Sequence, residues 1–196
     1  MSVTRAITLS SITLSSITLS ALCALLLGLM LITHDAHACS QREPTPATSP
    51  GPHDYSTATQ SQALWQRGDP GEPLFLHIRV LDRCAQPIEG ASVQVLHANH
   101  EGFHEANKFR GVYQTSERGQ VEFVTVFPGY TGGLPRHIHF IIKHPGYKQL
   151  VTRLFFNNDP SVDLAIAELA MVLEEIRLDG GLRGWTAVFE FVLATR

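Results

Sequence analysis

Hydrophobic and polar residues alternate along several stretches of the second half of the chain, which is the pattern of half-buried β-strands. In residues 74–82 the apolar side chains fall on every second position, at Leu74, Leu76, Ile78 and Val80. Residues 112–129 are expected to form a hairpin with its turn at 116–119, and further strands are expected over 92–98, 136–144, 150–156 and 187–193. Strands of this length, separated by turns, predict an all-β sandwich.

One C-terminal segment departs from the strand pattern. Its apolar residues are spaced by four, three, four and three positions, at Val162, Ile166, Leu169, Leu173 and Ile176. This spacing favours a helix, with Ser161 as a candidate N-cap. The run AMVLEEI within it also suits a strand, so the sequence leaves both structures open.

The chain divides into a leader, a polar stretch and one domain. Residues 1–38 combine an early arginine, an apolar run over 21–32 and a small-residue exit at 36–38, which is typical of a secretory signal peptide. The apolar run is shorter than the roughly 20 residues that span a bilayer. Residues 39–72 are rich in Pro, Ser, Thr and Gln and are expected to be a flexible linker. Residues 73–196 suffice for one domain.

Charge and cysteine usage narrow the setting of the protein. The formal net charge is −3, so no broad basic surface suggests nucleic acid as a partner. The leader predicts export to a periplasmic or extracellular location, where Cys39 and Cys84 could pair. A second interpretation is an envelope lipoprotein acylated on Cys39, and only then would the membrane be a partner. The oligomeric state leaves no mark in the sequence.

Two histidines, His137 and His139, are candidate metal ligands because alternate residues of a strand share one face. Neutral imidazole is a common ligand of iron, copper and zinc. The simpler interpretation is a half-exposed strand face. Tyr130 precedes them in a Gly-rich bend, and a phenolate is a hard anionic donor that suits ferric iron. The nearby histidines at 97, 100 and 104 are most simply explained by a solvated polar loop.

Longer segments around these residues carry a resemblance to a known family. They read RVLDRCAQPIEGASVQVLHANHEGFH, FVTVFPGYTGGLPRHIHFIIKHPGYKQLVTRLFFNNDP and FEFVL, and they extend from about Leu76 to the C-terminus. These segments resemble the intradiol ring-cleavage dioxygenases of the protocatechuate/catechol type. The resemblance implies a single β-sandwich domain of that type, with long loops and room for one C-terminal helix.

The same resemblance implies an activity and a cofactor. In that family, non-haem Fe(III) is held by two tyrosinates and two histidines, and a catechol is cleaved between its two hydroxyl-bearing carbons. The implied partners are a small aromatic diol and dioxygen. His137 and His139 fall on the two family histidines. Tyr130 stands one position before the usual tyrosine, so the implied metal ligands here are His137, His139 and Tyr130.

Two positions differ from the family pattern and leave alternatives open. Phe103 stands where the other tyrosine is expected, with His104 and Tyr113 as nearby substitutes. Leu134 stands where the family often has an arginine, and Arg136 is the nearest guanidinium. Tyr130 and Arg136 are therefore the candidate catalytic residues.

The leading hypothesis is an exported iron(III) dioxygenase that cleaves a catechol-type ring. The alternative is a non-catalytic β-sandwich binding protein of the cell envelope that has lost the full metal site, because Phe103 supplies no oxygen ligand. A third hypothesis places copper or zinc on His137, His139 and His104.

Overall fold

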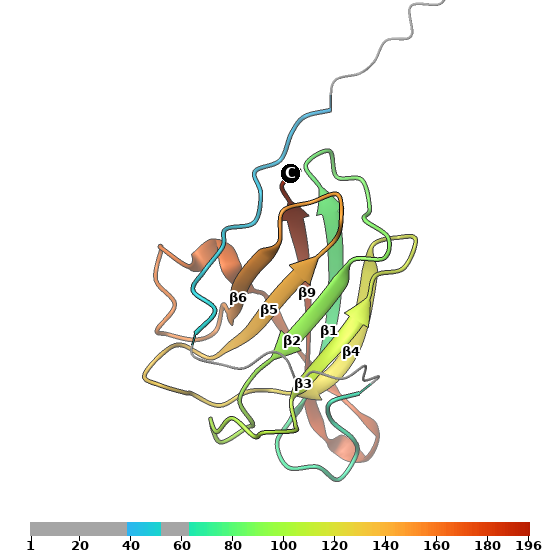
Figure 1. Cartoon of the computed structure of the whole chain (residues 1–196). Coiled ribbons are helices and arrows are strands. Elements are labelled where there is room, and N and C mark those ends of the chain that lie inside the picture. Colours follow the sequence, from blue (N-terminus) through green and yellow to red (C-terminus); the bar gives the residue numbers. More distant parts are fainter. Residues whose placement is uncertain (1–38, 52–62) are drawn as a thin grey trace, which may run out of the picture. The chain divides into compact units, whose positions relative to one another are not determined.

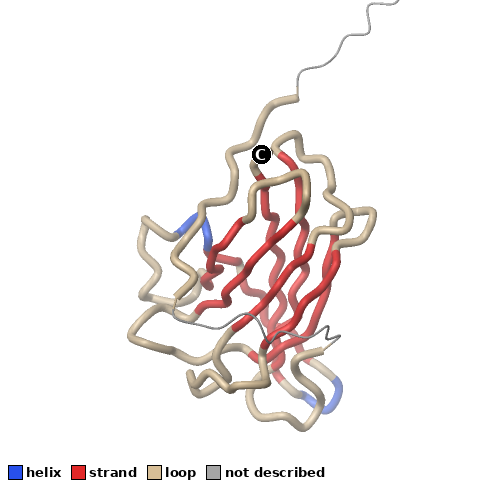
Figure 2. The backbone as a smooth tube through the Cα atoms, in the orientation of Figure 1, coloured by secondary structure: helices blue, strands red, loops and turns tan. Residues whose placement is uncertain are grey.

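The structure, a computed structural model, describes residues 39–51 and 63–196. The predicted leader, residues 1–38, lies outside the described residues, as does the middle of the predicted linker. Strands dominate the described part, with two short 3-10 turns (Figure 2). Within this part of the chain, no helix has the length and apolar character needed to cross a bilayer.

Two mixed sheets face each other across a hydrophobic core, which confirms the predicted all-β sandwich (Figure 1). The first sheet has the order β4 (Gln120–Val126), β1 (Pro73–Asp82), β9 (Arg183–Leu193), β8 (Leu173–Arg177). The second has the order β3 (Arg110–Gln114), β2 (Ser92–Leu96), β5 (His137–Lys143), β6 (Leu150–Phe156), β7 (Ala170–Met171).

The core forms where the alternating apolar faces of the two sheets meet. Leu74, Leu76, Ile78 and Val80 of β1 are at most 1% exposed, as their spacing predicted. From the other sheet, Phe140 of β5 places its ring 5.1 Å from that of Phe191. Aromatic rings at this separation add to the free energy gained by burying them.

The predicted hairpin over residues 112–129 is wrong. Strand β3 pairs with β2, and β4 pairs with β1, so the turn at 116–119 passes from one sheet to the other. Two anchors hold this crossing. The Thr115 hydroxyl donates to the Ile88 carbonyl (2.6 Å), and the Val80 N–H donates to the Gly119 carbonyl (2.8 Å). The edges offered by β1 and β2 therefore outcompete the local pairing that the turn suggested.

The helix expected from Val162 is also absent. The segment contains only a 3-10 turn, η1 (Ala167–Leu169), and then enters β7 and β8. The Asp159 carboxylate accepts the Ser161 N–H at 3.0 Å, and Asp163 accepts the Ala165 N–H at 3.0 Å. Such Asx turns offer the backbone an alternative to helical hydrogen bonds. A second 3-10 turn, η2 (Asp179–Gly181), precedes β9.

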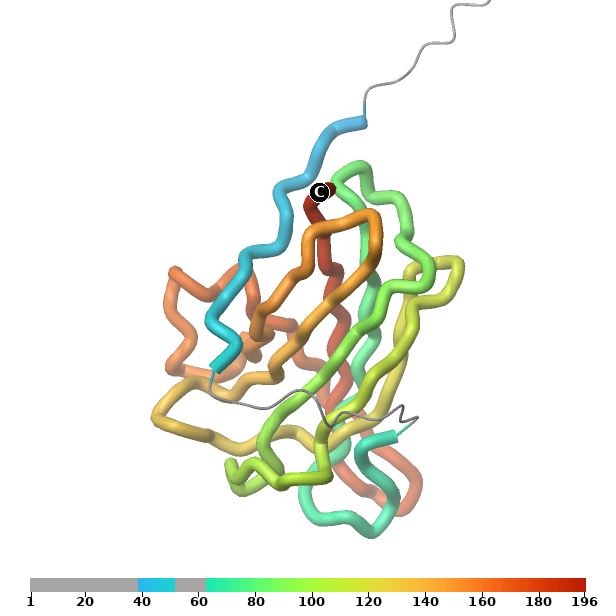
Figure 3. Tube along the Cα trace, viewed as in Figure 1, coloured from blue at the N-terminus to red at the C-terminus, as the bar shows by residue number. Residues whose placement is uncertain are grey.

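The described parts of the predicted linker form hydrogen bonds with the sandwich. The Thr45 N–H donates to the Val192 carbonyl and the Thr48 N–H to the Val151 carbonyl, both at 2.9 Å. Figure 3 shows residues 40–51 running beside β6. Because β7 pairs with only the last two residues of β6, the rest of that edge is open to this segment. Few apolar side chains are needed when the backbone supplies the contacts.

Candidate metal centre

Strand β5 places the two candidate histidines on the face of its sheet opposite the core. Ile138, Phe140 and Ile142 belong to the core cluster, so His137 and His139 alternate onto the other face. Both are nevertheless buried, with exposed fractions of 3% and 2%. A half-exposed strand face is therefore excluded. The two imidazoles lie in an enclosed site on the outer face of the second sheet.

The Nε2 atoms of the two histidines converge. They lie 3.1 Å apart, and the two rings are 4.7 Å apart at 73°. The His137 Nδ1 lies 2.7 Å from the Pro135 carbonyl, which can only accept, so Nδ1 carries the proton and Nε2 keeps its lone pair. For two nitrogens about 2.1 Å from one ion, a 3.1 Å separation corresponds to an angle of about 95°. The pair fits two adjacent ligands of one metal ion.

Three cross-strand neighbours surround the histidine pair. Leu96 of β2 and Arg153 of β6 lie directly opposite His139, and Phe155 lies opposite His137 with its ring 6.0 Å away. Arg153 escaped the sequence analysis. The turn between two adjacent strands sets their register, but the turn at 144–149 does not by itself reveal which residue faces His139.

Tyr130 and Arg136 contact each other. The Arg136 guanidinium lies 4.3 Å from the Tyr130 ring and 5.2 Å from the Phe127 ring. Tyr130 is 47% exposed. Arg136 immediately precedes His137, so strand alternation directs it to the opposite side of the chain. The structure thus brings the two candidate catalytic residues together, beside the start of β5.

The Gly-rich bend that carries Tyr130 is locked to the loop that carries Phe103. The Gly129 N–H donates to the Asn99 carbonyl at 2.9 Å. Gly102 has φ +92°, and a Cβ there would collide with the Tyr130 carbonyl oxygen. Phe103 itself is 66% exposed. The residue at the position of the second family tyrosine therefore points its ring to solvent.

Among the other loop histidines, only His100 is exposed as expected. His97 is buried, with Nδ1 2.7 Å from the Ala98 carbonyl and Nε2 2.6 Å from the Thr125 hydroxyl. Burial lowers the pKa of His97 to about 4, so its ring is neutral. Sequence reasoning missed this because His97 follows an apolar strand by one residue and was grouped with the polar loop.

The two proposed substitutes for the missing tyrosine differ in position. The His104 ring lies 6.3 Å from that of His139. Tyr113 stacks on Phe123 at 4.6 Å, between the sheets and on the core side. Within residues 39–51 and 63–196, no group of three or more His, Cys, Asp or Glu side chains could hold a metal. The histidine pair thus forms part of a metal site, and His104 does not complete it.

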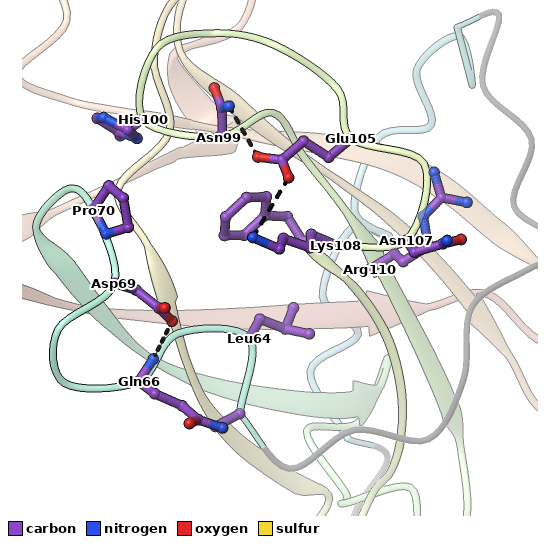
Figure 4. A pocket seen from close by; sticks show the side chains of 12 residues that line it. Leu64, Gln66, Asp69, Pro70, Asn99, His100, Glu105, Asn107, Lys108 and Arg110 are labelled. Atoms are coloured by element: carbon purple, nitrogen blue, oxygen red, sulfur yellow. Dashed lines mark hydrogen bonds and ion pairs between the residues drawn. The ribbon is translucent and has the colours of Figure 1, made fainter.

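Two hollows open beside the loop that carries His100. The larger, about 390 Å³, is lined by polar residues of the 99–110 loop and of residues 63–70 (Figure 4). In it, Glu105 accepts from the Asn99 amide at 3.0 Å and pairs with Lys108 at 3.7 Å. The smaller, about 280 Å³, is lined by Arg136, Phe127 and Trp185 among others. His100 borders both hollows.

Comparison with known proteins identifies relatives over most of the domain. Residues 46–195 match the model of a protein family described as dioxygenase. The chain is 31% identical over 144 residues to catechol 1,2-dioxygenase 2 of Acinetobacter lwoffii. It is also 31% identical over 168 residues, 70% of this chain, to 6-chlorohydroxyquinol 1,2-dioxygenase of Cupriavidus pinatubonensis. These matches cover 52% and 60% of the two relatives, so the chain spans little more than half of their length.

Solved structures share the same fold. The dioxygenase domain of a dioxygenase carbohydrate-binding protein fusion from Streptomyces sp. SirexAA-E has a TM-score of 0.68 at 28% identity. The match covers 79% of this chain and all of that domain. The 3-chlorocatechol 1,2-dioxygenase from Rhodococcus opacus has a TM-score of 0.70 at 18% identity, covering 94% of this chain and 90% of that one, which shows the fold alone.

Proposed function

Because this chain belongs to the intradiol ring-cleavage dioxygenase family, we propose that it is itself an iron(III) dioxygenase that cleaves a catechol-type ring between the two hydroxyl-bearing carbons. Its substrates are a small aromatic diol and dioxygen. The observation that carries the proposal is the convergence of the His137 and His139 Nε2 atoms at 3.1 Å in an enclosed site.

The residues of the chain divide the work of holding the ion and the substrate. The carbonyl of Pro135 fixes the tautomer and the orientation of His137, so that Nε2 faces its partner on His139. Tyr130 is the anionic third ligand, on a bend that is locked to the neighbouring loop through Gly129. When bound, ferric iron supplies the Lewis acidity that makes a chelated catechol electron-poor enough to react with dioxygen.

Burial of the site and a nearby cation complete the proposal. The two imidazoles are at most 3% exposed, and a site that excludes water strengthens the electrostatic interactions inside it. Arg136 is the candidate for stabilising negative charge on the substrate. Its contact with the Tyr130 ring keeps the guanidinium beside that phenol.

Iron content and colour test the metal site. The protein, prepared without an affinity tag and loaded with iron, should show a phenolate-to-iron charge-transfer band and should consume oxygen with catechol or hydroxyquinol. His137→Ala should lose the iron, and Tyr130→Phe should lose the band. His144→Ala, at a histidine in the turn after β5, is the matched control and should keep both. A colourless protein that retains no iron would refute the proposal.

One observation favours a second candidate function, a non-catalytic binding protein of the envelope. Phe103 offers no oxygen and is exposed, so the family's fourth ligand has no counterpart at this position. In that case His137→Ala would leave ligand binding unchanged. Elemental analysis also identifies copper or zinc, which would favour a different metal chemistry on the same histidine pair.

We also propose that the protein is exported. Cys39 and Cys84 are both disulfide-bonded, which suits a periplasmic or extracellular location. A sulfur atom in a disulfide cannot also carry a lipid, so this bonding disfavours the lipoprotein. Fractionation of cells that produce the full chain, followed by mass spectrometry of the N-terminus, tests both points.

A further inference from the structure

We propose that Arg153 recognises an anionic substituent, a carboxylate in the first instance, on the aromatic ring of the substrate. The inference rests on the proposed function and names a substrate class for it: a catechol that carries a ring carboxylate. It assigns a specificity role to a residue on the same sheet face as the histidine pair.

The strand register places Arg153 beside the histidines. Strands β5 and β6 are antiparallel, and Arg153 is the direct partner of His139. Side chains of directly opposed residues project from the same face, with Cβ atoms about 4.5–5.5 Å apart. The long arginine side chain therefore starts next to His139 and can reach a ligand held at its Nε2 atom.

Arg153 has no anionic partner among the described residues. No ion pair there involves it, and its Nε atom is buried without a hydrogen-bond acceptor. Other arginines are paired: Arg42 and Arg79 both contact Glu190 at 2.9 Å, and Arg183 contacts Glu72. A buried cationic group without an anion is costly. An anion supplied by the ligand would remove that cost.

A charge count indicates which part of the substrate Arg153 contacts. In the proposed site, the three charges of Fe(III) are balanced by one phenolate, from Tyr130, and by the two oxygens of a diolate. The positive charge of Arg153 is then left over. A further negative charge on the ring balances it, and a carboxylate matches the planar guanidinium through two parallel hydrogen bonds.

The other nearby guanidinium does not compete for this role. Arg136 lies against the rings of Tyr130 and Phe127, and strand alternation directs it away from the face that carries His137 and His139. Arg153 is thus the cation that shares a face with the histidine pair.

Binding measured without turnover tests the inference. Isothermal titration of the iron-loaded full chain under argon compares 3,4-dihydroxybenzoate with catechol. We expect the carboxylated diol to bind roughly tenfold or more tightly, the effect of one charge-assisted contact. Arg153→Gln should abolish the preference while leaving catechol affinity within about threefold, and Arg153→Lys should restore part of it.

Lys143→Gln is the matched control, since it removes a cation from the same strand face about 13 Å beyond His139. It should keep the preference. Equal binding of the two diols by the wild-type chain, or a preference that survives in Arg153→Gln, would overturn the inference alone. Failure of both diols to bind would instead overturn the proposed function, and the inference with it.

Discussion

Protonation of the buried His97 should make the fold acid-sensitive. Its Nδ1–H donates to the Ala98 carbonyl, and its Nε2 accepts from the Thr125 hydroxyl, so a second proton has no acceptor. Burial lowers the pKa from 6.5 to about 4. The unfolded chain therefore binds more protons than the folded chain between these values. Stability is highest above pH 6.5 and falls as the pH drops toward 4.

The size of the effect follows from the shift. A difference of 2.5 pKa units corresponds to about 3 kcal/mol in total, of which about 2 kcal/mol is lost between pH 7.5 and pH 5. Replacing His97 by Asn keeps a donor for the Ala98 carbonyl but cannot take up a proton. The variant should be less stable at pH 7.5, because the bond to Thr125 is lost, yet its stability should fall by about 2 kcal/mol less on acidification.

Urea unfolding with EDTA present, at pH values from 7.5 to 5, measures the difference. The chelator removes metal binding by the neighbouring histidines as a second source of pH dependence. His77→Asn removes a histidine from the surface of β1 and should follow the wild-type profile. Parallel profiles for the wild type and the His97 variant would show that the reasoning about His97 is wrong.

Two further substitutions test the packing that supports the site, each against a control of the same residue type. Phe140→Ala should cost about 3–5 kcal/mol because that ring is fully buried, whereas Phe103→Ala should stay within about 0.5 kcal/mol. Similar losses for both would contradict the assignment of Phe140 to the core. Gly102→Ala, with φ +92° and a collision with the Tyr130 carbonyl, should destabilise the chain by more than Gly132→Ala, where a Cβ meets open space. Both comparisons use urea midpoints.

The strands with a clear period of two were predictable because each face is defined by neighbours along the chain. Leu74 to Val80 and residues 150–156 illustrate this, and so does the shared face of His137 and His139. The helix from Val162 failed because local Asx turns at Asp159 and Asp163 opposed a spacing that looked helical. The hairpin failed because pairing partners are chosen among all available edges, and the nearest in sequence did not prevail.

The sequence by itself determined the fold class, the inward-facing residues of the main strands, and the pair of imidazoles, since all three depend on alternation within single strands. Only the tertiary structure decided that this pair is enclosed, that Arg153 faces His139, that Phe103 points to solvent and that Tyr130 contacts Arg136. These features depend on strand register and on contacts between loops far apart in sequence. The order of residues along one segment does not specify either.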